Sequence, residues 1–432
     1  MLRTGVSRVQ FAVMFAAMLA AIQNKLGFKP GAYPSQFRLK FSGMLVSTVG
    51  SSMVWPFLIV YVSGKLHLPL TTVASLITIS SACGLISSLL GGPVIDRFGR
   101  KWVMVVSLLL NGGGYLLMSQ ASTFPVFALI MALNGTVNPL YRVAADAMMA
   151  DLIPPEQRPE AYSLLRMASN LGISVGPALG GFLAAVSYTI TFSIAAAGLA
   201  AFSLLVAVFA HETMPKRAPL GSQKVEHERF GGYGKVLANL PFTGMVLVFS
   251  LVQVCASLIW MLLAVYSKTN YGVNESQYGW IPTTNAAMVV LFQFGVTRLV
   301  KRFRPLMLMA MGASFYAAAT FSVAYGTGFW MFWGSMVVMT IGELILMPTT
   351  STYTANLAPP ELRARYMSLS GLTWQVASGI GPVFGGMLSD QLGPRTIWFG
   401  GGVVGLISIL GFLALGQIFR KEPATAGAGR PG

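Results

Sequence analysis

Charged residues are scarce in this sequence of 432 residues, where Asp, Glu, Lys and Arg together make up 10%. Soluble domains contain roughly 25%. A chain with so few charges cannot cover a surface that faces water, and 54% of its residues are hydrophobic. The composition therefore predicts a membrane protein. At roughly 20 apolar residues per span, the length accommodates about a dozen membrane helices.

Cysteine and histidine are also rare, with two and three residues respectively. Cys83 and Cys255 lie in apolar runs of different halves, and the histidines fall outside the apolar runs. This distribution excludes a disulfide framework, a metal cluster and a Cys/His catalytic pair. We expect no metal, no cofactor and no enzymatic activity. A membrane enzyme acting on lipids is the least favoured class, because the few acids are scattered.

Acidic residues are outnumbered, 13 against 29 basic residues, which gives a net charge of +16. In a soluble protein this excess would suggest nucleic acid, but here the basic residues fall in short connections between apolar runs, where they set orientation. Connections rich in Lys and Arg alternate with connections that hold only Lys65, Lys268 and Arg395. We therefore predict a protein of the inner cell membrane with both termini cytoplasmic and no nucleic-acid partner.

The two halves of the chain are copies of each other. Residues 151–181 read DLIPPEQRPEAYSLLRMASNLGISVGPALGG, and 205 positions later residues 356–386 read NLAPPELRARYMSLSGLTWQVASGIGPVFGG. A repeat about half a chain long in so apolar a sequence predicts two similar helix bundles with a site between them.

Apolar runs of span length recur along both halves. We place twelve membrane helices near residues 41–62, 73–91, 102–120, 125–149, 161–186, 189–210, 242–266, 278–299, 306–325, 329–353, 366–388 and 396–418. The predicted fold is an all-α membrane protein of two pseudo-symmetric six-helix bundles. Its domains are an N-terminal extension at 1–35, a bundle at 36–210, a cytoplasmic linker at 211–239, a bundle at 240–419 and a disordered tail at 420–432. The extension contains an apolar run too short to span, which fits an interfacial helix, a disordered segment, a cleaved signal peptide or a functional segment.

A charged loop, GGPVIDRFGRK at residues 91–101, joins the second and third predicted spans. It can form a latch in which the Asp caps a neighbouring helix end and an Arg pairs with another acid. The pattern resembles the loop signature G-x-x-x-D-R-x-G-R-K of the major facilitator superfamily. The matching residues are Gly92, Asp96, Arg97, Gly99, Arg100 and Lys101. The resemblance implies a latch that steadies the outward-open state by tying the second helix to the eleventh, with Asp151 as the partner acid.

Glycines recur every four residues on the fifth predicted span, in GISVGPALGG at residues 172–181. Small residues let two helices approach closely, and the proline bends its helix, so packing alone can explain the run. The run also resembles the antiporter motif G-x-x-x-G-P-x-x-G-G of the superfamily's twelve-helix drug:proton antiporters. The matching residues are Gly172, Gly176, Pro177, Gly180 and Gly181. The resemblance covers the chain after about residue 35 and favours export.

Three ionisable residues lie within predicted spans, where each charge costs about 2.5 to 3.5 kcal/mol. Arg142 and Asp146 are four positions apart on the fourth span and can neutralise each other on one face. Glu343 is the lone acid of the tenth span, which suits a group that gains and loses a proton. All three are proton-coupling candidates. The structural alternatives are that Asp146 only compensates Arg142 and that Glu343 bonds a neighbouring helix end.

Polar and aromatic residues on the first, fourth, seventh and tenth spans are candidates for the lining of a central cavity. They are Trp55, Asn138, Tyr141, Gln253, Trp260 and Met347. Rings and thioethers suit a bulky apolar or cationic substrate. We therefore predict a monomer in the lipid bilayer that exports small hydrophobic or cationic compounds, of the multidrug-efflux type, by proton antiport and alternating access. The alternative is an importer, by proton symport or uniport, of a small metabolite such as a sugar or organic acid.

Overall fold

The computed structural model describes residues 34–154, 157–214, 233–300 and 302–419, and all the elements in these ranges are helices. Twelve long helical segments follow one another through them. The first is continuous through α2 (Ser35–Val54), η1 (Trp55–Phe57) and α3 (Leu58–Leu66), and the others are α4 (Leu70–Phe98), α5 (Arg100–Gln120), α6 (Phe124–Leu152), α7 (Arg158–Val186), α8 (Tyr188–Phe209), α10 (Leu240–Tyr271), α12 (Trp280–Val300), α13 (Pro305–Tyr325), α14 (Phe329–Leu357), α15 (Arg363–Leu392) and α16 (Thr396–Ile418). Short helices α9 (Tyr233–Leu237), α11 (Glu275–Tyr278) and η3 (Pro360–Leu362) stand in the connections.

Each predicted span overlaps one of these segments, so the predicted all-helical fold is confirmed. Ten of the segments are long and apolar enough to cross a membrane by themselves. The other two, α12 and α15, are as long but more polar. Both pack against the other half of the molecule, α12 on α7 and α15 on α4. Both helices therefore have neighbours in the other half as well as in their own.

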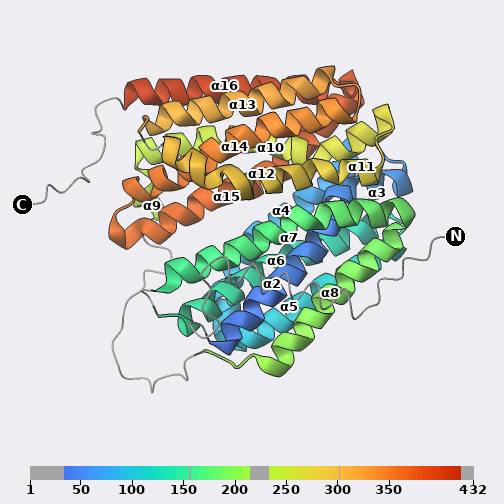
Figure 1. The fold of residues 1–432 in the computed structure, drawn as a ribbon, viewed down its shortest axis with the longest axis vertical. Helices are drawn as coiled ribbons and strands as arrows, with labels where there is room; N and C mark the ends of the chain where they lie inside the picture. The colour runs from blue at the N-terminus through green and yellow to red at the C-terminus, as the bar shows by residue number, and fades with distance from the viewer. Residues whose placement is uncertain (1–33, 155–156, 215–232, 301, 420–432) are drawn as a thin grey trace, which may run out of the picture.

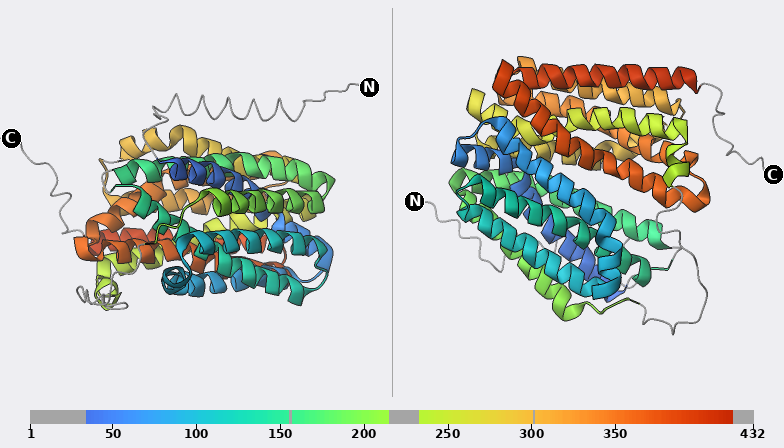
Figure 2. Two further views of the ribbon diagram at one scale, coloured as in Figure 1. Left: turned by 90° about the horizontal axis from the view of Figure 1, so that it is seen from below. Right: turned by 180° about the vertical axis from the view of Figure 1, so that it is seen from behind.

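The helices up to α8 form one half of the molecule, and those from α9 onward form the other (Figure 1). Figure 2 shows the same division from two further sides. Equivalent helices make equivalent contacts, because α2 packs on α7 as α10 packs on α15. The halves meet through α4 with α15, and through α7 with α11 and α12. Residues 1–33 and 420–432 of the predicted extension and tail, and most of the predicted linker, lie outside the described ranges.

Successive long helices run in opposite directions, so the connections gather at two ends of the molecule. We call the end at which α4 passes into α5 the basic end, because it carries Arg97, Arg100 and Lys101. The other end, at which α3 passes into α4, is called the opposite end.

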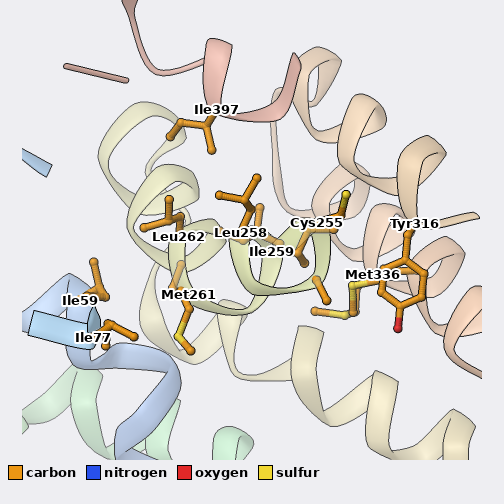
Figure 3. Close-up of a cluster of buried hydrophobic side chains, with 14 of the residues drawn as sticks. Ile59, Ile77, Cys255, Leu258, Ile259, Met261, Leu262, Tyr316, Met336 and Ile397 are labelled. Carbon is orange, nitrogen blue, oxygen red and sulfur yellow. The ribbon is translucent and has the colours of Figure 1, made fainter. Parts of the chain in front are cut away.

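α10 carries apolar side chains on all of its faces, which is typical of a helix inside the core. Leu258, Ile259 and Leu262 of α10 are completely buried. Figure 3 shows Ile59 and Ile77 of the first half on the side of α10 that carries Met261 and Leu262. The core of the second half therefore continues into the first half near the opposite end.

Candidate functional site

Glu343 is not isolated within its helix, because a buried amide holds it. Asn285 of α12, 4% exposed, donates from Nδ2 to Glu343 Oε2 at 2.7 Å and to Thr340 Oγ1 at 2.9 Å. The Thr340 hydroxyl in turn donates to the carbonyl of Met336 at 2.7 Å. Sequence reasoning missed Asn285, although an asparagine inside an apolar span was the available signal. The half-buried Glu343 carboxylate is thereby oriented at the middle of α14.

Asn138, Arg142 and Asp146 form an exposed stripe along α6, at intervals of four residues. Asp146 pairs with Lys40 of α2, whose Nζ lies 3.7 Å from Asp146 Oδ1. The Lys40 side chain is 5% exposed, and its Nζ also donates to the carbonyl of Ala145. The predicted pairing of Arg142 with Asp146 is therefore wrong, because Lys40 of α2 is the partner of Asp146. In the described residues, no carboxylate forms an ion pair with Arg142.

Trp55 and Trp260 meet between the halves, with ring centroids 5.9 Å apart and a 53° angle between the rings. Trp55 lies in η1 and Trp260 in α10, so the two side chains come from different halves. Of the other lining candidates, Met347 is half-buried on α14. The structure thus brings together the two largest rings among the predicted lining residues.

Tyr141 and Gln253 lie deeper in the packing of their own halves. Tyr141 stacks edge to face on Phe202 of α8, with centroids 6.2 Å apart. Gln253 is 4% exposed, and its Oε1 accepts no hydrogen bond from the described part of the chain. An apolar cavity of about 220 Å³ lies elsewhere, between α4 and α6, and includes none of the predicted lining residues.

The charged loop at the basic end makes the contact expected of Arg100. Arg100 Nη1 pairs with Asp151 Oδ2 at the end of α6 and donates to the Thr213 carbonyl at 3.3 Å. The helix cap predicted for Asp96 is not formed in the described part of the structure, and Glu212 caps α5 instead. Glu212 accepts the backbone N–H groups of Arg100 and Lys101 at 3.1 and 3.0 Å. Asp96 is exposed and accepts no hydrogen bond in the described ranges.

Glu212 was missed because it lies 112 positions from Arg100 in the sequence and only folding brings them together. The turn before α5 requires its glycine, since Gly99 has φ 83° and a Cβ there would strike Glu212. Arg97 lies over the ring of Phe98 at 5.5 Å from the centroid. A Cβ at Gly92 would meet open space, so the glycine of the signature is not needed sterically in this conformation.

The glycines of α7 allow backbone contact with the first helix. Cβ atoms at Gly172, Gly176 and Gly180 would overlap α2 at Thr48, Ser52 and Met53 respectively. In addition, the Ser52 hydroxyl donates to the Gly172 carbonyl at 3.1 Å.

The last residues of the motif face the other half. A Cβ at Gly181 would strike the backbone of Glu275 in α11, and one at Gly279 would strike the carbonyl of Pro177. The second copy is arranged alike, since a Cβ at Gly386 of α15 would lie 2.7 Å from Thr71 Cα of α4. Both copies therefore place a glycine where the halves touch at the opposite end.

Asp390 of α15 fastens one of these contacts. Its carboxylate accepts the N–H groups of Leu70 and Thr71 at 3.1 and 2.9 Å and the Thr71 hydroxyl at 2.7 Å. A carboxylate at a helix N-terminus satisfies free N–H groups and complements the helix dipole. An acid of the second half thus caps a helix of the first.

Glu275 fastens the other contact. It accepts hydrogen bonds from the hydroxyl of Tyr188 in α8, at 2.6 Å, and from Nζ of Lys268 in α10. Burial alone acts to raise the pKa of Glu275, but the bonds from Lys268 and Tyr188 outweigh it, so the pKa lies below the usual range. Asp390 and Glu275, which the sequence analysis did not identify as candidates, therefore join the halves at the opposite end.

A family model described as Major Facilitator Superfamily matches residues 41–274 and 245–431. The chain is 24% identical over 371 residues to the uncharacterized MFS-type transporter YhjO of Bacillus subtilis (strain 168), covering 85% of this chain and 90% of that protein. It is 25% identical over 398 residues to a Na(+), Li(+), K(+)/H(+) antiporter of Planococcus maritimus, covering 84% and 91%. It is 27% identical over 347 residues to the multidrug resistance protein MdtH of Citrobacter koseri, covering 79% and 84%.

Solved structures share the arrangement of helices. A POT family transporter in complex with a thioalcohol-conjugated peptide superposes with a TM-score of 0.74 at 17% identity, covering 90% of this chain and 97% of that one. A bacterial homolog of the human lysosomal transporter Spinster, inward-facing and occupied, has a TM-score of 0.73 at 14% identity, covering 90% and 98%. At such low identity these likenesses concern the fold alone.

Proposed function

The chain belongs to the major facilitator superfamily and is a multi-pass membrane transporter, and we propose that it exports small hydrophobic or cationic compounds in exchange for protons. The observation that carries this proposal is Glu343, a carboxylate held at the middle of α14 by the amide of Asn285. A carboxylate at this depth in the membrane is energetically costly, and residues of this kind usually have a role in transport. Two relatives are named as a cation/proton antiporter and a multidrug resistance protein, which supports exchange and export.

The proposed topology has the basic end in the cytoplasm of an inner-membrane protein, because Lys and Arg concentrate on the cytoplasmic side of membrane helices. The bundles at 36–210 and 240–419 rock against each other, and the linker at 211–239 joins them. One chain suffices, since the site lies between its own halves.

Transport then uses Glu343 as a site for which proton and substrate compete. When the opposite end is open, Glu343 takes up a proton and releases the cationic group. When the basic end is open, the proton leaves and the carboxylate attracts the next substrate. Asn285 keeps the carboxylate oriented through both steps, because an amide N–H donates to the ionised and the neutral form alike.

The remaining motif residues bias the two conformations in this proposal. Asp390 and Glu275 hold the opposite end closed, and Gly181 of α7 allows close contact with α11 there. At the basic end, Arg100, Asp151 and Glu212 keep the α4–α5 turn in place, ready for Asp96 to engage when that end closes.

The energy of the proton gradient is sufficient for useful export. One proton crossing about 100 mV supplies about 2.3 kcal/mol, and a difference of one pH unit adds about 1.4 kcal/mol. Their sum, about 3.7 kcal/mol, corresponds to accumulation of about five hundredfold per proton.

The test is proton release from acidified inside-out vesicles, followed with a pH-sensitive dye while cationic, neutral and anionic compounds are added in turn. Cationic or neutral hydrophobic compounds should provoke release from wild-type vesicles. Glu343→Gln should abolish it, because the amide keeps the bond with Asn285 but cannot exchange a proton. Glu361→Gln is the matched control, since Glu361 is exposed in η3 and should leave release unchanged. Release that persists in Glu343→Gln at every pH removes Glu343 from the mechanism. If no compound provokes release from a folded, inserted protein, the importer becomes the better hypothesis.

A further inference from the structure

The two tryptophans that meet between the halves are counterparts in the internal repeat. Trp55 and Trp260 are 205 positions apart, the offset that relates residues 151–181 to 356–386. Contacts repeat with the same offset, because Ser52 donates to the Gly172 carbonyl at 3.1 Å and Ser257 to the Ala377 carbonyl at 3.1 Å. Two counterparts whose rings are 5.9 Å apart must lie beside the axis that relates them. The pseudo-twofold axis therefore passes between these rings.

An axis along the helices leaves depth unchanged, so counterpart residues lie at the same level between the two ends. The offset of 205 pairs Asn138 of α6 with Glu343 of α14, and Arg142 with Met347. Arg142 is four residues beyond Asn138 toward the basic end. It consequently lies one helical turn, about 6 Å, from the level of Glu343.

Two faces of α6 are exposed, and they differ in chemistry. One carries Val126 and Leu129, which are 45% and 72% exposed and suit contact with lipid. Asn138 follows Leu129 after nine residues, which is two and a half turns, so it points the other way. Arg142 shares the face of Asn138. Because a charge facing lipid is costly, the polar face lies toward the space between the halves.

The face of α14 that carries Glu343 points to the same space. Ile341, 36% exposed, precedes Glu343 by two residues and so lies about 200° away around the helix. Glu343 itself is bonded to Asn285 of α12, the helix that packs against α7 of the first half. Arg142 and Glu343 therefore face one interior from opposite halves.

Within the described ranges, neither Arg142 nor Glu343 forms an ion pair with another side chain. Asp146, the acid nearest to Arg142 in the sequence, pairs with Lys40, and Glu343 is hydrogen-bonded to the neutral amide of Asn285. We propose that the substrates of this transporter are amphoteric aromatic compounds, which place a basic group at Glu343, an acidic group at Arg142 and a ring against the Trp55–Trp260 pair. This inference rests on the proposed function and narrows its substrate class.

Arg142, Glu343 and the tryptophan pair each match one part of such a compound. A guanidinium forms paired, charge-assisted hydrogen bonds with a carboxylate, and the carboxylate of Glu343 does the same for an ammonium group. A ligand with both charges satisfies both side chains at once, whereas a simple cation leaves Arg142 without a counter-charge. The tilted rings of the tryptophan pair present an apolar floor on which an aromatic body packs.

The test uses four compounds with one skeleton: naphthylalanine, its methyl ester, its N-acetyl derivative and the N-acetyl methyl ester. Their binding to the purified full-length protein in nanodiscs is measured by equilibrium dialysis, which needs no proton gradient. The wild-type protein should bind naphthylalanine at least about tenfold more tightly than its ester, the effect of one hydrogen bond between charged groups. Arg142→Gln should reduce the affinity for the amino acid to that for the ester and leave the ester unchanged. Arg142→Lys should recover part of the preference, and the control Arg298→Gln, at the basic end of α12, should retain all of it.

A second measurement covers the case in which this skeleton binds too weakly. Cells that express each variant are challenged with matched amphoteric and cationic aromatic inhibitors of growth. Arg142→Gln should lose protection against the amphoteric compounds and retain it against the cationic ones. Equal binding of acid and ester by the wild-type protein, or equal protection by Arg142→Gln against both classes, overturns the inference. Proton release with the ester alone would then leave the proposed function standing, whereas absence of release with all four compounds and the cationic inhibitors refutes that function separately.

Discussion

Replacing Asp390 with Asn should weaken the closure of the opposite end. The carboxylate accepts hydrogen bonds from Leu70 N at 3.1 Å, Thr71 N at 2.9 Å and Thr71 Oγ1 at 2.7 Å, all across the boundary between the halves. These bonds exist only while the halves are together at this end. Their free energy therefore stabilises the present conformation relative to the one in which this end is open.

The size of the effect follows from these bonds. Asparagine keeps one acceptor oxygen and loses the second together with the negative charge. Complete loss of an N-cap costs about 0.5 to 2 kcal/mol, of which asparagine loses only a part because it keeps one acceptor. Loss of a charge beside a helix N-terminus costs about 0.3 to 1 kcal/mol. Because Asp390 is exposed, the lower parts of these ranges apply. Their sum, about 1 to 2 kcal/mol, shifts the equilibrium about 5- to 30-fold toward the open conformation.

The assay is a distance measurement by electron spin resonance between labels at Val186 and Trp330, which are 79% and 75% exposed. They stand at the opposite end on α7 and α14, away from the cap itself. Cys83 and Cys255 are replaced beforehand. Asp390→Asn should add a population at longer distance, while the surface control Glu361→Gln should match the parent protein. If Asp390→Asn gives the parent's distribution as well, the cap does not hold the halves together.

Two further predictions concern the same end of the molecule. Gly180→Ala would bring a Cβ within 2.7 Å of Met53 Cα and should lower the free energy of unfolding by about 1 to 3 kcal/mol. The control is Gly113→Ala, where a Cβ meets open space, and it should be neutral or stabilising. Both are compared by thermal unfolding, and equal melting temperatures of the two variants would contradict the steric argument for Gly180. Since the pKa of Glu275 in the closed state is lowered, its contribution to closure is complete above its ordinary pKa of about 4.3 and is lost as the pH falls through the lowered value. The label distance should therefore stay constant from neutral pH to about pH 5, and a Glu275-dependent opening near neutrality would refute this assignment.

Much of the fold could be predicted because its determinants are local. Hydropathy and helix-ending residues act within one span, so the segment predicted at 396–418 coincides with α16. The spacing of Gly172, Gly176 and Gly180 predicts one contact face, since residues four apart share a side of a helix. The repeat likewise predicted two similar halves, because its offset of 205 relates residues 151–181 to 356–386.

The partners of polar side chains could not be predicted in the same way. Arg142 and Asp146 share a face, yet the buried Lys40 reaches Asp146 from another helix. The sequence does not indicate the partners of Asn285, Glu212 and Asp390, because these lie 58, 112 and 320 positions away respectively.

By itself, the sequence determined that this chain is a twelve-helix membrane protein made of two related halves, because apolar length and repetition are properties of the sequence. Only the tertiary structure decided which acids join the halves and which charged side chains form ion pairs in the described ranges. The physical reason is that hydrogen bonds and ion pairs require atoms within a few ångströms of each other, and in this protein the crossing of distant helices sets those distances.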